Sequence, residues 1–218
     1  MNIEKQQAFM AELNALCEKY GVDKPFISKI EPDKKDMERL ENIRKELIET
    51  ILLPGDIAEI GVYKGKTAKH IHNIAPLKTL HLYDTFAGIV EADSSVDVHG
   101  NGEFGDTSYE AVKNELGKDH VKYHVGTFPY TFDEKDTVFC FVYSDTDTYF
   151  GAKSTLDIFA PLMVSGGKIM FDDYGWKGCP GIKKAIDEFI VLERQQVKYR
   201  NIKFIYPEGE DTQFTIVF

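Results

Sequence analysis

The chain has 218 residues, with 36 acidic and 26 basic side chains and a formal net charge of −10. Because 43% of the residues are hydrophobic and 12% are aromatic, the chain can bury an ordinary core, which excludes a disordered protein. The negative charge argues against nucleic acid as a partner. No apolar run approaches the roughly 20 residues of a membrane span, and the start lacks a signal peptide's apolar centre. We therefore expect a cytoplasmic protein that binds neither nucleic acid nor membrane.

Two apolar stripes at helical spacing fill the first fifty residues, one over residues 9–20 and one over residues 37–51. Pro54 ends the second helix. Since later segments already supply helical layers, we expect residues 1–53 to form a helical segment that covers the active site or meets a neighbouring subunit in a homo-oligomer. Residues 54–218 are expected to form the main domain.

From residue 56 onward, short apolar runs alternate with helical segments. This alternation predicts an α/β fold with a mostly parallel sheet and helices on both faces. The last two strands are separated by a short loop and must pair antiparallel. The pattern is typical of a Rossmann-like, seven-stranded methyltransferase sheet. The expected strands are Ile57–Val62, Thr79–Tyr83, Val121–Val125, Val138–Tyr143, Lys168–Phe171 and the pair at 202–206 and 214–218, and the expected helices are Lys66–Ile74, Thr107–Leu116, Tyr149–Phe159 and Gly181–Glu193.

The first predicted strand ends in an acid and a glycine turn, with Glu59, Gly61 and Gly65 in the spacing E-x-G-x-x-x-G. Glycines at such a turn let a ligand approach the backbone, and the following helix offers free N–H groups. A dinucleotide fingerprint would need glycine where Glu59 stands. An acid would repel a pyrophosphate but suits the ammonium group of S-adenosylmethionine. We therefore predict cofactor binding by this turn, including Tyr63 and Thr67, with a purely structural turn as the alternative.

Asp84 ends the second strand, 25 residues after Glu59, where an acid can accept hydrogen bonds from both ribose hydroxyls. Alone it would be interpreted as a turn aspartate, and the pairing with Glu59 favours the ribose. After the third strand, Gly126 and Thr127 form a turn expected to meet the adenine end. The long segment 85–106 follows a strand end, and a loop of that length is usually functional or disordered.

Carboxylates cluster directly after the fourth and fifth strands, at the same edge of the sheet. They would repel one another unless a cation intervened, and a hard divalent ion such as Mg²⁺ fits oxygen ligands. We predict that Asp145, Asp172 and Asp173 bind the metal. Asp147 fits a cap of the next helix better than a ligand.

The histidines are interpreted as surface or core residues. His81 and His124 are isolated in sequence, whereas His99 lies in the long loop and could touch substrate. Cys179 lies near the acidic cluster in sequence, and all cysteines are expected to be reduced thiols.

Five segments occur in order, GDIAEIGVYKGKTA, LYDTFAG, DTDTY, GGKIMFDDYG and CPGIKKAIDEF. They resemble the macrocin O-methyltransferase family, whose members are metal-dependent methyltransferases that modify sugars of antibiotics. The resemblance covers roughly residues 54–189. It implies a class I, S-adenosylmethionine-dependent O-methyltransferase that acts on a sugar or a glycosylated natural product. It also implies Mg²⁺ on Asp145, Asp172 and Asp173, with Asp145 a candidate proton acceptor and 54–218 the methyltransferase domain.

Two alternatives remain open. Asp145 and Asp147 form a D-x-D pattern that could serve a Mn²⁺-dependent nucleotide-sugar glycosyltransferase, although Glu59 and Asp84 would then have no role. The chain could also be a methyltransferase-like scaffold that binds a cofactor or a partner without turnover. Binding of S-adenosylmethionine but not a nucleotide sugar excludes the first, and product formation excludes the second.

Overall fold

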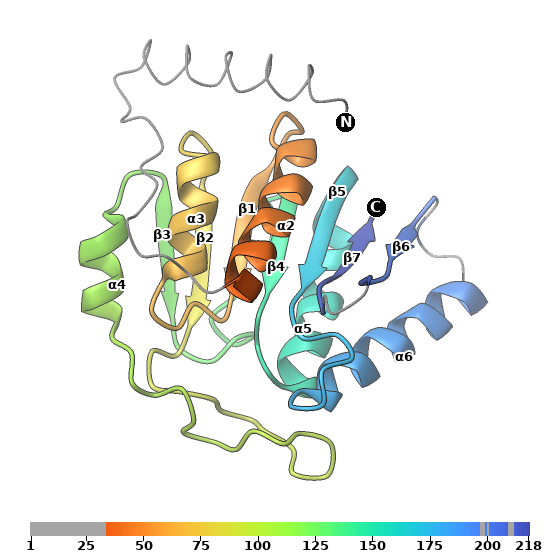
Figure 1. Cartoon of the computed structure of the whole chain (residues 1–218). Helices are drawn as coiled ribbons and strands as arrows, with labels where there is room; N and C mark the ends of the chain where they lie inside the picture. Colours follow the sequence, from red (N-terminus) through yellow and green to blue (C-terminus); the bar gives the residue numbers. More distant parts are fainter. Residues whose placement is uncertain (1–33, 197–198, 200, 209–211) are drawn as a thin grey trace.

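The computed structural model describes residues 34–196, 199, 201–208 and 212–218. Within these residues seven strands form one sheet in the order β3-β2-β1-β4-β5-β7-β6 (Figure 1). Strands β1 to β5 pair in parallel, and β7 pairs antiparallel with β5 and with β6. This confirms the predicted Rossmann-like methyltransferase sheet. The strands are β1 (Asp56–Ile60), β2 (Leu80–Asp84), β3 (Val121–Val125), β4 (Phe139–Ser144), β5 (Met163–Phe171), β6 (Lys203–Ile205) and β7 (Phe214–Val217).

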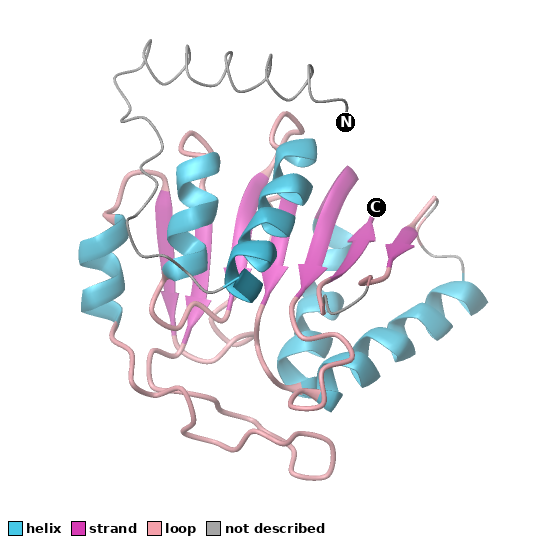
Figure 2. Cartoon of the chain, in the orientation of Figure 1, coloured by secondary structure: helices cyan, strands magenta, loops and turns pink. Residues whose placement is uncertain are grey.

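Helices cover both faces of the sheet (Figure 2), and none of those described is long and apolar enough to cross a membrane. On one face, Leu47 of α2 and Ile71 of α3 pack with Phe141 of β4. On the other, Phe159 of α5 and Ile186 of α6 pack in a second core. Every residue of β4 is buried, as expected for a central parallel strand. The helices are α2 (Lys34–Thr50), α3 (Lys66–Ile74), α4 (Tyr109–Leu116), α5 (Tyr149–Phe159), the short 3₁₀ helix η1 (Ala160–Leu162) and α6 (Pro180–Gln196).

Helix α2 belongs to the layer that covers the sheet. It contacts α3, β4 and β5, and its Leu47 is fully buried. The buried Lys168 of β5 fixes it further, because Nζ donates to Glu46 Oε2 at 2.7 Å and to Glu49 Oε2 at 2.6 Å. The expectation that later segments complete this layer is therefore wrong for α2. The predicted helix over residues 9–20 lies outside the described residues.

Strand β5 begins at Met163, five residues before the predicted start at Lys168. The predicted start follows the Gly166-Gly167 pair, but in the structure this pair lies within the strand. Gly166 has φ +82°, and a Cβ on Gly167 would lie 2.9 Å from the carbonyl oxygen of Val164. The register of β4 and β5 shifts between Phe139 and Phe141. The glycines therefore permit a local irregularity without ending the strand.

Candidate active site

A cavity of about 420 Å³ lies at the carboxyl edge of the parallel strands, where the ends of β1, β2, β3 and β4 meet. Small-molecule sites commonly have volumes of about 300–1,000 Å³, so the cavity suits a ligand of cofactor size. The structure brings nearly all of the predicted cofactor residues to this one place. The predicted residues that line it are Glu59, Gly61, Tyr63, Thr67, Asp84, Gly126, Thr127 and Asp145.

The two predicted glycines of the first turn have different structural roles. Gly61 has φ +83°, and a Cβ there would lie 1.9 Å from the carbonyl oxygen of Asp145, so glycine lets the β1 and β4 ends approach each other. Gly65 does not line the cavity. It has φ +78° at the start of α3, and a Cβ would lie 3.0 Å from Val112. Gly61 is among the residues that line the cavity, and the ligand contact predicted for both glycines stays a prediction.

Glu59 is buried in the cavity wall, and one oxygen of its carboxyl has no hydrogen-bond partner among the described residues. The residue is 1% exposed, and the oxygen without a partner is Oε2. Burial raises the pKa of this carboxyl well above its usual range, Arg39 lowers it, and Asp84 raises it further. A buried carboxylate in this state is stabilised by a cationic group placed next to it. The cavity beside Glu59 therefore suits a positively charged ligand group.

Asp84 holds the glycine turn through its carboxylate. Oδ2 accepts from the backbone N–H groups of Val62 at 2.6 Å and Tyr63 at 2.8 Å, and Oδ1 accepts from Phe86 N–H at 2.6 Å. An ionised carboxylate has about four acceptor positions, so capacity remains for a ligand hydroxyl. The turn interpretation of Asp84 is thus correct, while its contact with a ribose stays a prediction.

Three carboxylates gather at the β4 and β5 ends. One oxygen each of Asp145, Asp147 and Asp173 lies within 4.8 Å of the others. Burial, followed by the charges of Asp172 and Asp147, raises the pKa of Asp145 well above its usual range. The same causes raise the pKa of Asp173 to about 7. Such mutual repulsion is what a bound cation relieves, and oxygen ligands suit a hard divalent ion.

The membership of this group differs from the prediction in two residues. Asp172 is not one of the three grouped carboxylates. Its Oδ2 accepts a hydrogen bond from Tyr143 Oη at 2.7 Å, and its Oδ1 accepts one from the backbone N–H of Asp173 at 3.0 Å. Asp147 is not a cap, which corrects our interpretation. Thr148 caps α5, its hydroxyl accepting from Gly151 N–H at 3.1 Å, and Asp147 has φ +58°.

Arg39 enters the site from α2 and has no counterpart in the sequence prediction. Its Nη1 donates to Tyr143 Oη at 3.0 Å and to Asp172 Oδ2 at 3.1 Å, and lies 3.4 Å from Asp145 Oδ2. Its Nη2 donates to Thr67 Oγ1 at 3.0 Å. Arg39 is 106 residues away from Asp145 in the chain, so no local motif indicates it. It supplies a positive charge that is part of the fold.

The 85–106 segment forms a further wall of the cavity, to which it contributes Val90 and Phe104. Figure 1 shows it running below the sheet from β2 toward α5 and α6. Asp97 attaches this segment to the start of α5, because its Oδ1 accepts a hydrogen bond from the backbone N–H of Tyr149 at 2.8 Å. A Cβ on Gly181 would lie 2.1 Å from that oxygen, so glycine permits the contact. Sequence patterns did not single out Asp97.

The sheet order, with five parallel strands followed by an antiparallel pair, is that of the class I methyltransferase fold. More specifically, the chain belongs to the macrocin O-methyltransferase family, because the family profile described as Macrocin-O-methyltransferase (TylF) matches residues 2–203. The resemblance seen in the sequence is confirmed, and with it the class of O-methyltransferase. The glycosyltransferase alternative loses its support. No curated protein matches the chain.

Solved structures show the same fold. The O-methyltransferase NovP has 23% identity and a TM-score of 0.67, with 83% of this chain and 79% of NovP covered. The calicheamicin methyltransferase CalS11 has 19% identity and a TM-score of 0.66, with 100% and 94% covered. An O-methyltransferase from Bacillus cereus in complex with SAH has 11% identity and a TM-score of 0.54, with 97% and 91% covered.

Proposed function

We propose that the protein transfers a methyl group from S-adenosylmethionine to a hydroxyl of a sugar or glycosylated natural product, with the help of a divalent cation such as Mg²⁺. One observation carries the proposal. A single cavity joins the buried Glu59, whose Oε2 has no hydrogen-bond partner, to Asp145 and Asp147 after β4, so one part of its wall suits a cationic cofactor and another suits a metal. The structures of NovP and CalS11, which are named as methyltransferases, support the reaction class.

The cofactor residues follow from the cavity. We assign Glu59 as the partner for the ammonium group, since its carboxyl is buried and Oε2 has no hydrogen bond, and a cation beside it would favour the ionised form. Asp84 is held by the backbone of the first turn and faces the same cavity, so we assign it to the ribose. Gly126 and Thr127 line the end of the cavity near β3, where we place the adenine.

For the metal we propose Asp145, Asp147 and Asp173, and this is supported by the close approach of their carboxylate oxygens. Asp172 is committed to Tyr143 and Arg39 in the described arrangement. It stays a candidate ligand, since a bound cation would compete with Arg39 for the same carboxylate. When bound, the divalent ion would lower the pKa of the acceptor hydroxyl as a Lewis acid.

The residues of the chain itself perform the remaining tasks. We assign Asp145 to accept the hydroxyl proton, because it lies in the cavity wall beside the other aspartates. The carbon–sulfur bond breaks as the carbon–oxygen bond forms, and the electron pair returns to sulfur. Since the reaction neutralises charge, placing the two reactants contributes more than stabilising new charge. Val90 and Phe104 cover the cavity with apolar side chains.

Calorimetric titration with S-adenosylmethionine tests the cofactor assignment. Glu59→Gln preserves the shape and removes the charge, so the affinity should fall at least tenfold, since hydrogen bonds to charged groups contribute about 1.5–3 kcal/mol. Glu110→Gln, at an exposed position of α4, is the control and should bind normally. Equal affinity of wild type and Glu59→Gln would contradict the assignment.

The acceptor class is tested with labelled S-adenosylmethionine and a panel of nucleotide-linked and glycosidic sugars, with and without Mg²⁺. We expect label in at least one sugar product, and only with the cation present. Binding of the cofactor without any product on this panel would instead favour the alternative of a non-catalytic methyltransferase-like protein.

A further inference from the structure

A second group of titratable side chains is separate from the group of Asp145, Asp147 and Asp173. His81 comes from β2, His124 from β3 and Glu134 from the segment between β3 and β4. Nδ1 of His81 lies 3.2 Å from Nε2 of His124 and 3.6 Å from Oε1 of Glu134. The three atoms lie within 4.8 Å of one another. The histidines interpreted as isolated in sequence are thus brought together by the pairing of β2 with β3.

In each imidazole, the nitrogen that does not face the other histidine, called here the outer nitrogen, faces a carboxylate. Nε2 of His81 lies 3.0 Å from Asp56 Oδ2, and Nδ1 of His124 lies 3.4 Å from Asp133 Oδ1. Histidines that bind metals in proteins are usually oriented in this way. If both outer nitrogens carry the proton, the two neutral rings direct lone pairs at each other across 3.2 Å. A positive charge between them, from a metal ion or a proton, turns this repulsion into attraction.

The spacing fits a zinc-type ion. Two nitrogens bound to one tetrahedral Zn²⁺ at about 2.0–2.1 Å lie roughly 3.3 Å apart, and the observed separation of His81 Nδ1 and His124 Nε2 is 3.2 Å. Imidazole and carboxylate are both ligands of zinc, whereas Mg²⁺ prefers oxygen. The rings are nearly parallel, at 11°, with centroids 5.4 Å apart. A modest tilt of each ring would aim both nitrogens at an ion on the side of Glu134.

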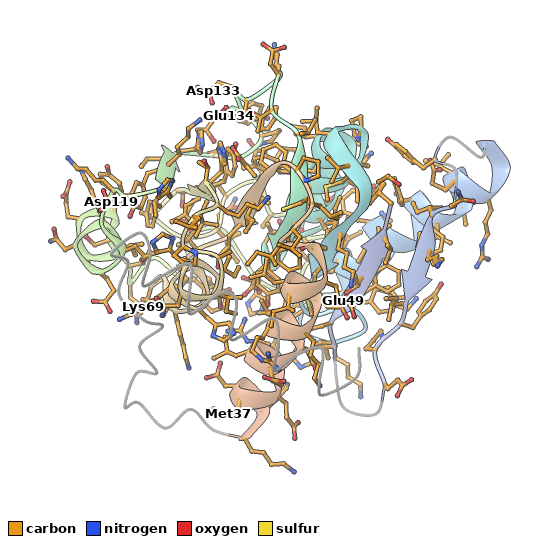
Figure 3. All side chains as sticks on the ribbon, turned by 90° about the horizontal axis from the view of Figure 1, so that it is seen from above. Met37, Glu49, Lys69, Asp119, Asp133 and Glu134 are labelled. Carbon is orange, nitrogen blue, oxygen red and sulfur yellow. The ribbon has the colours of Figure 1, made fainter. Side chains whose placement is uncertain are left out.

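The charges around the imidazoles favour a cation. Three carboxylates surround the imidazoles, those of Asp56, Asp133 and Glu134. One positive charge opposes them, that of Lys122, whose Nζ lies 2.8 Å from Glu134 Oε1. Figure 3 shows Asp133 and Glu134 together at one edge of the molecule. The Glu134 side chain is 18% exposed and that of His81 is fully buried, so an ion can enter from the side of Glu134.

Tyr83 is a buried polar residue in contact with His124. Its ring stacks on His124 with centroids 4.2 Å apart, and its residue is fully buried. The hydroxyl is buried and has no hydrogen-bond partner among the described residues. Burial, and then the charges of Glu134 and Asp133, raise the pKa of this phenol.

We propose that His81, His124 and Glu134 bind one zinc-type divalent ion, beside the Tyr83 ring that stacks on His124. The role of the ion is structural. It joins β2 and β3 to the segment before β4, which contains no helix between residues 126 and 138. Because Tyr83 also lines the cofactor cavity, the ion fixes one wall of that cavity. This site goes beyond the proposed function and does not depend on it.

Zn²⁺ is titrated calorimetrically into the metal-stripped full chain, with excess Mg²⁺ present to occupy oxygen-ligand sites. We expect one equivalent of Zn²⁺ to bind, and Co²⁺ in its place to give the visible absorption of a tetrahedral site. Glu134→Gln should weaken binding at least tenfold, and Asp56→Asn by about 10- to 100-fold through loss of the carboxylate behind His81. Asp119→Asn, an exposed acid labelled in Figure 3, is the matched control and should bind normally.

Asp173→Asn separates this site from the acidic group. If Zn²⁺ binding is lost in Asp173→Asn but kept in Glu134→Gln and His124→Asn, the ion belongs to the aspartates and the proposal is wrong. It is also wrong if the folded wild-type chain, verified by circular dichroism, binds no Zn²⁺, since the imidazoles then share a proton. Neither result bears on methyl transfer.

Discussion

The two halves of the cavity are built on different principles. The half formed by the β1, β2 and β3 ends is held by hydrogen bonds, because Asp84 accepts from two backbone N–H groups of the turn after β1. The half formed by the β4 and β5 ends gathers like charges, which Arg39 partly balances from α2. The first half is stabilised by hydrogen bonds, and the second half stores electrostatic repulsion that a cation can relieve.

The largest expected effect is in the acidic half. Asp145→Asn should reduce methyl transfer at least a thousandfold, about 4 kcal/mol, because it removes the proposed proton acceptor and a metal ligand together. The affinity for S-adenosylmethionine should change little, since Glu59 and Asp84 lie elsewhere. Rates with an identified acceptor and calorimetry with the cofactor check both statements. A loss of cofactor affinity as large as the loss of rate would show that the two halves are not separate.

Asp147→Asn and Asp172→Asn decide which carboxylate completes the metal group. The structure favours Asp147, because its oxygen lies with those of Asp145 and Asp173. Calorimetric titration with Mg²⁺ should therefore show the larger loss in Asp147→Asn. The reverse order would restore the ligand set predicted from sequence and would mean that Arg39 releases Asp172 when the cation binds.

Arg39→Met tests the charge that α2 contributes. Removal of one partner of a buried ion pair costs about 3–5 kcal/mol, and we expect about 2–3 kcal/mol here because the Arg39 side chain is 24% exposed. Added Mg²⁺ should recover part of the loss, since it replaces the missing positive charge. Denaturant unfolding with and without Mg²⁺ measures both values, and Lys34→Met at an exposed position of α2 is the control. No recovery with Mg²⁺ would mean that Arg39 acts through packing alone.

Asp84→Ala should weaken S-adenosylmethionine about 10- to 100-fold, as expected for the loss of hydrogen bonds to a charged acceptor. Part of the effect comes from the turn, because Val62 and Tyr63 lose their common acceptor. Asp84→Asn keeps one acceptor oxygen and should be milder. If calorimetry finds normal affinity in Asp84→Ala, the ribose assignment fails.

The smallest expected effect is the pH dependence of stability without a cation. Asp173 has a pKa of about 7 in the folded chain and an ordinary value of 3.8, so the folded state binds more protons between these values. The free energy of unfolding should therefore fall as the pH rises from about 4 to about 7. Mg²⁺ should oppose this fall, and Asp173→Asn should flatten it. Unfolding curves across this range that show a rise attributable to Asp173 would contradict the sign.

Sequence patterns alone predicted the fold, and they also pointed to several residues that line the cofactor half of the cavity. Hydrophobic alternation identified every described strand, with β5 misjudged only at the glycine pair, and the acid and glycine spacing indicated Glu59, Gly61 and Asp84. These signals are local, because a turn and its neighbouring strands specify them. Tertiary structure alone decided the partners of the aspartates. Arg39, Asp97 and the His81–His124 pair reach their sites through packing between elements far apart in the chain, and no spacing along the sequence encodes such contacts.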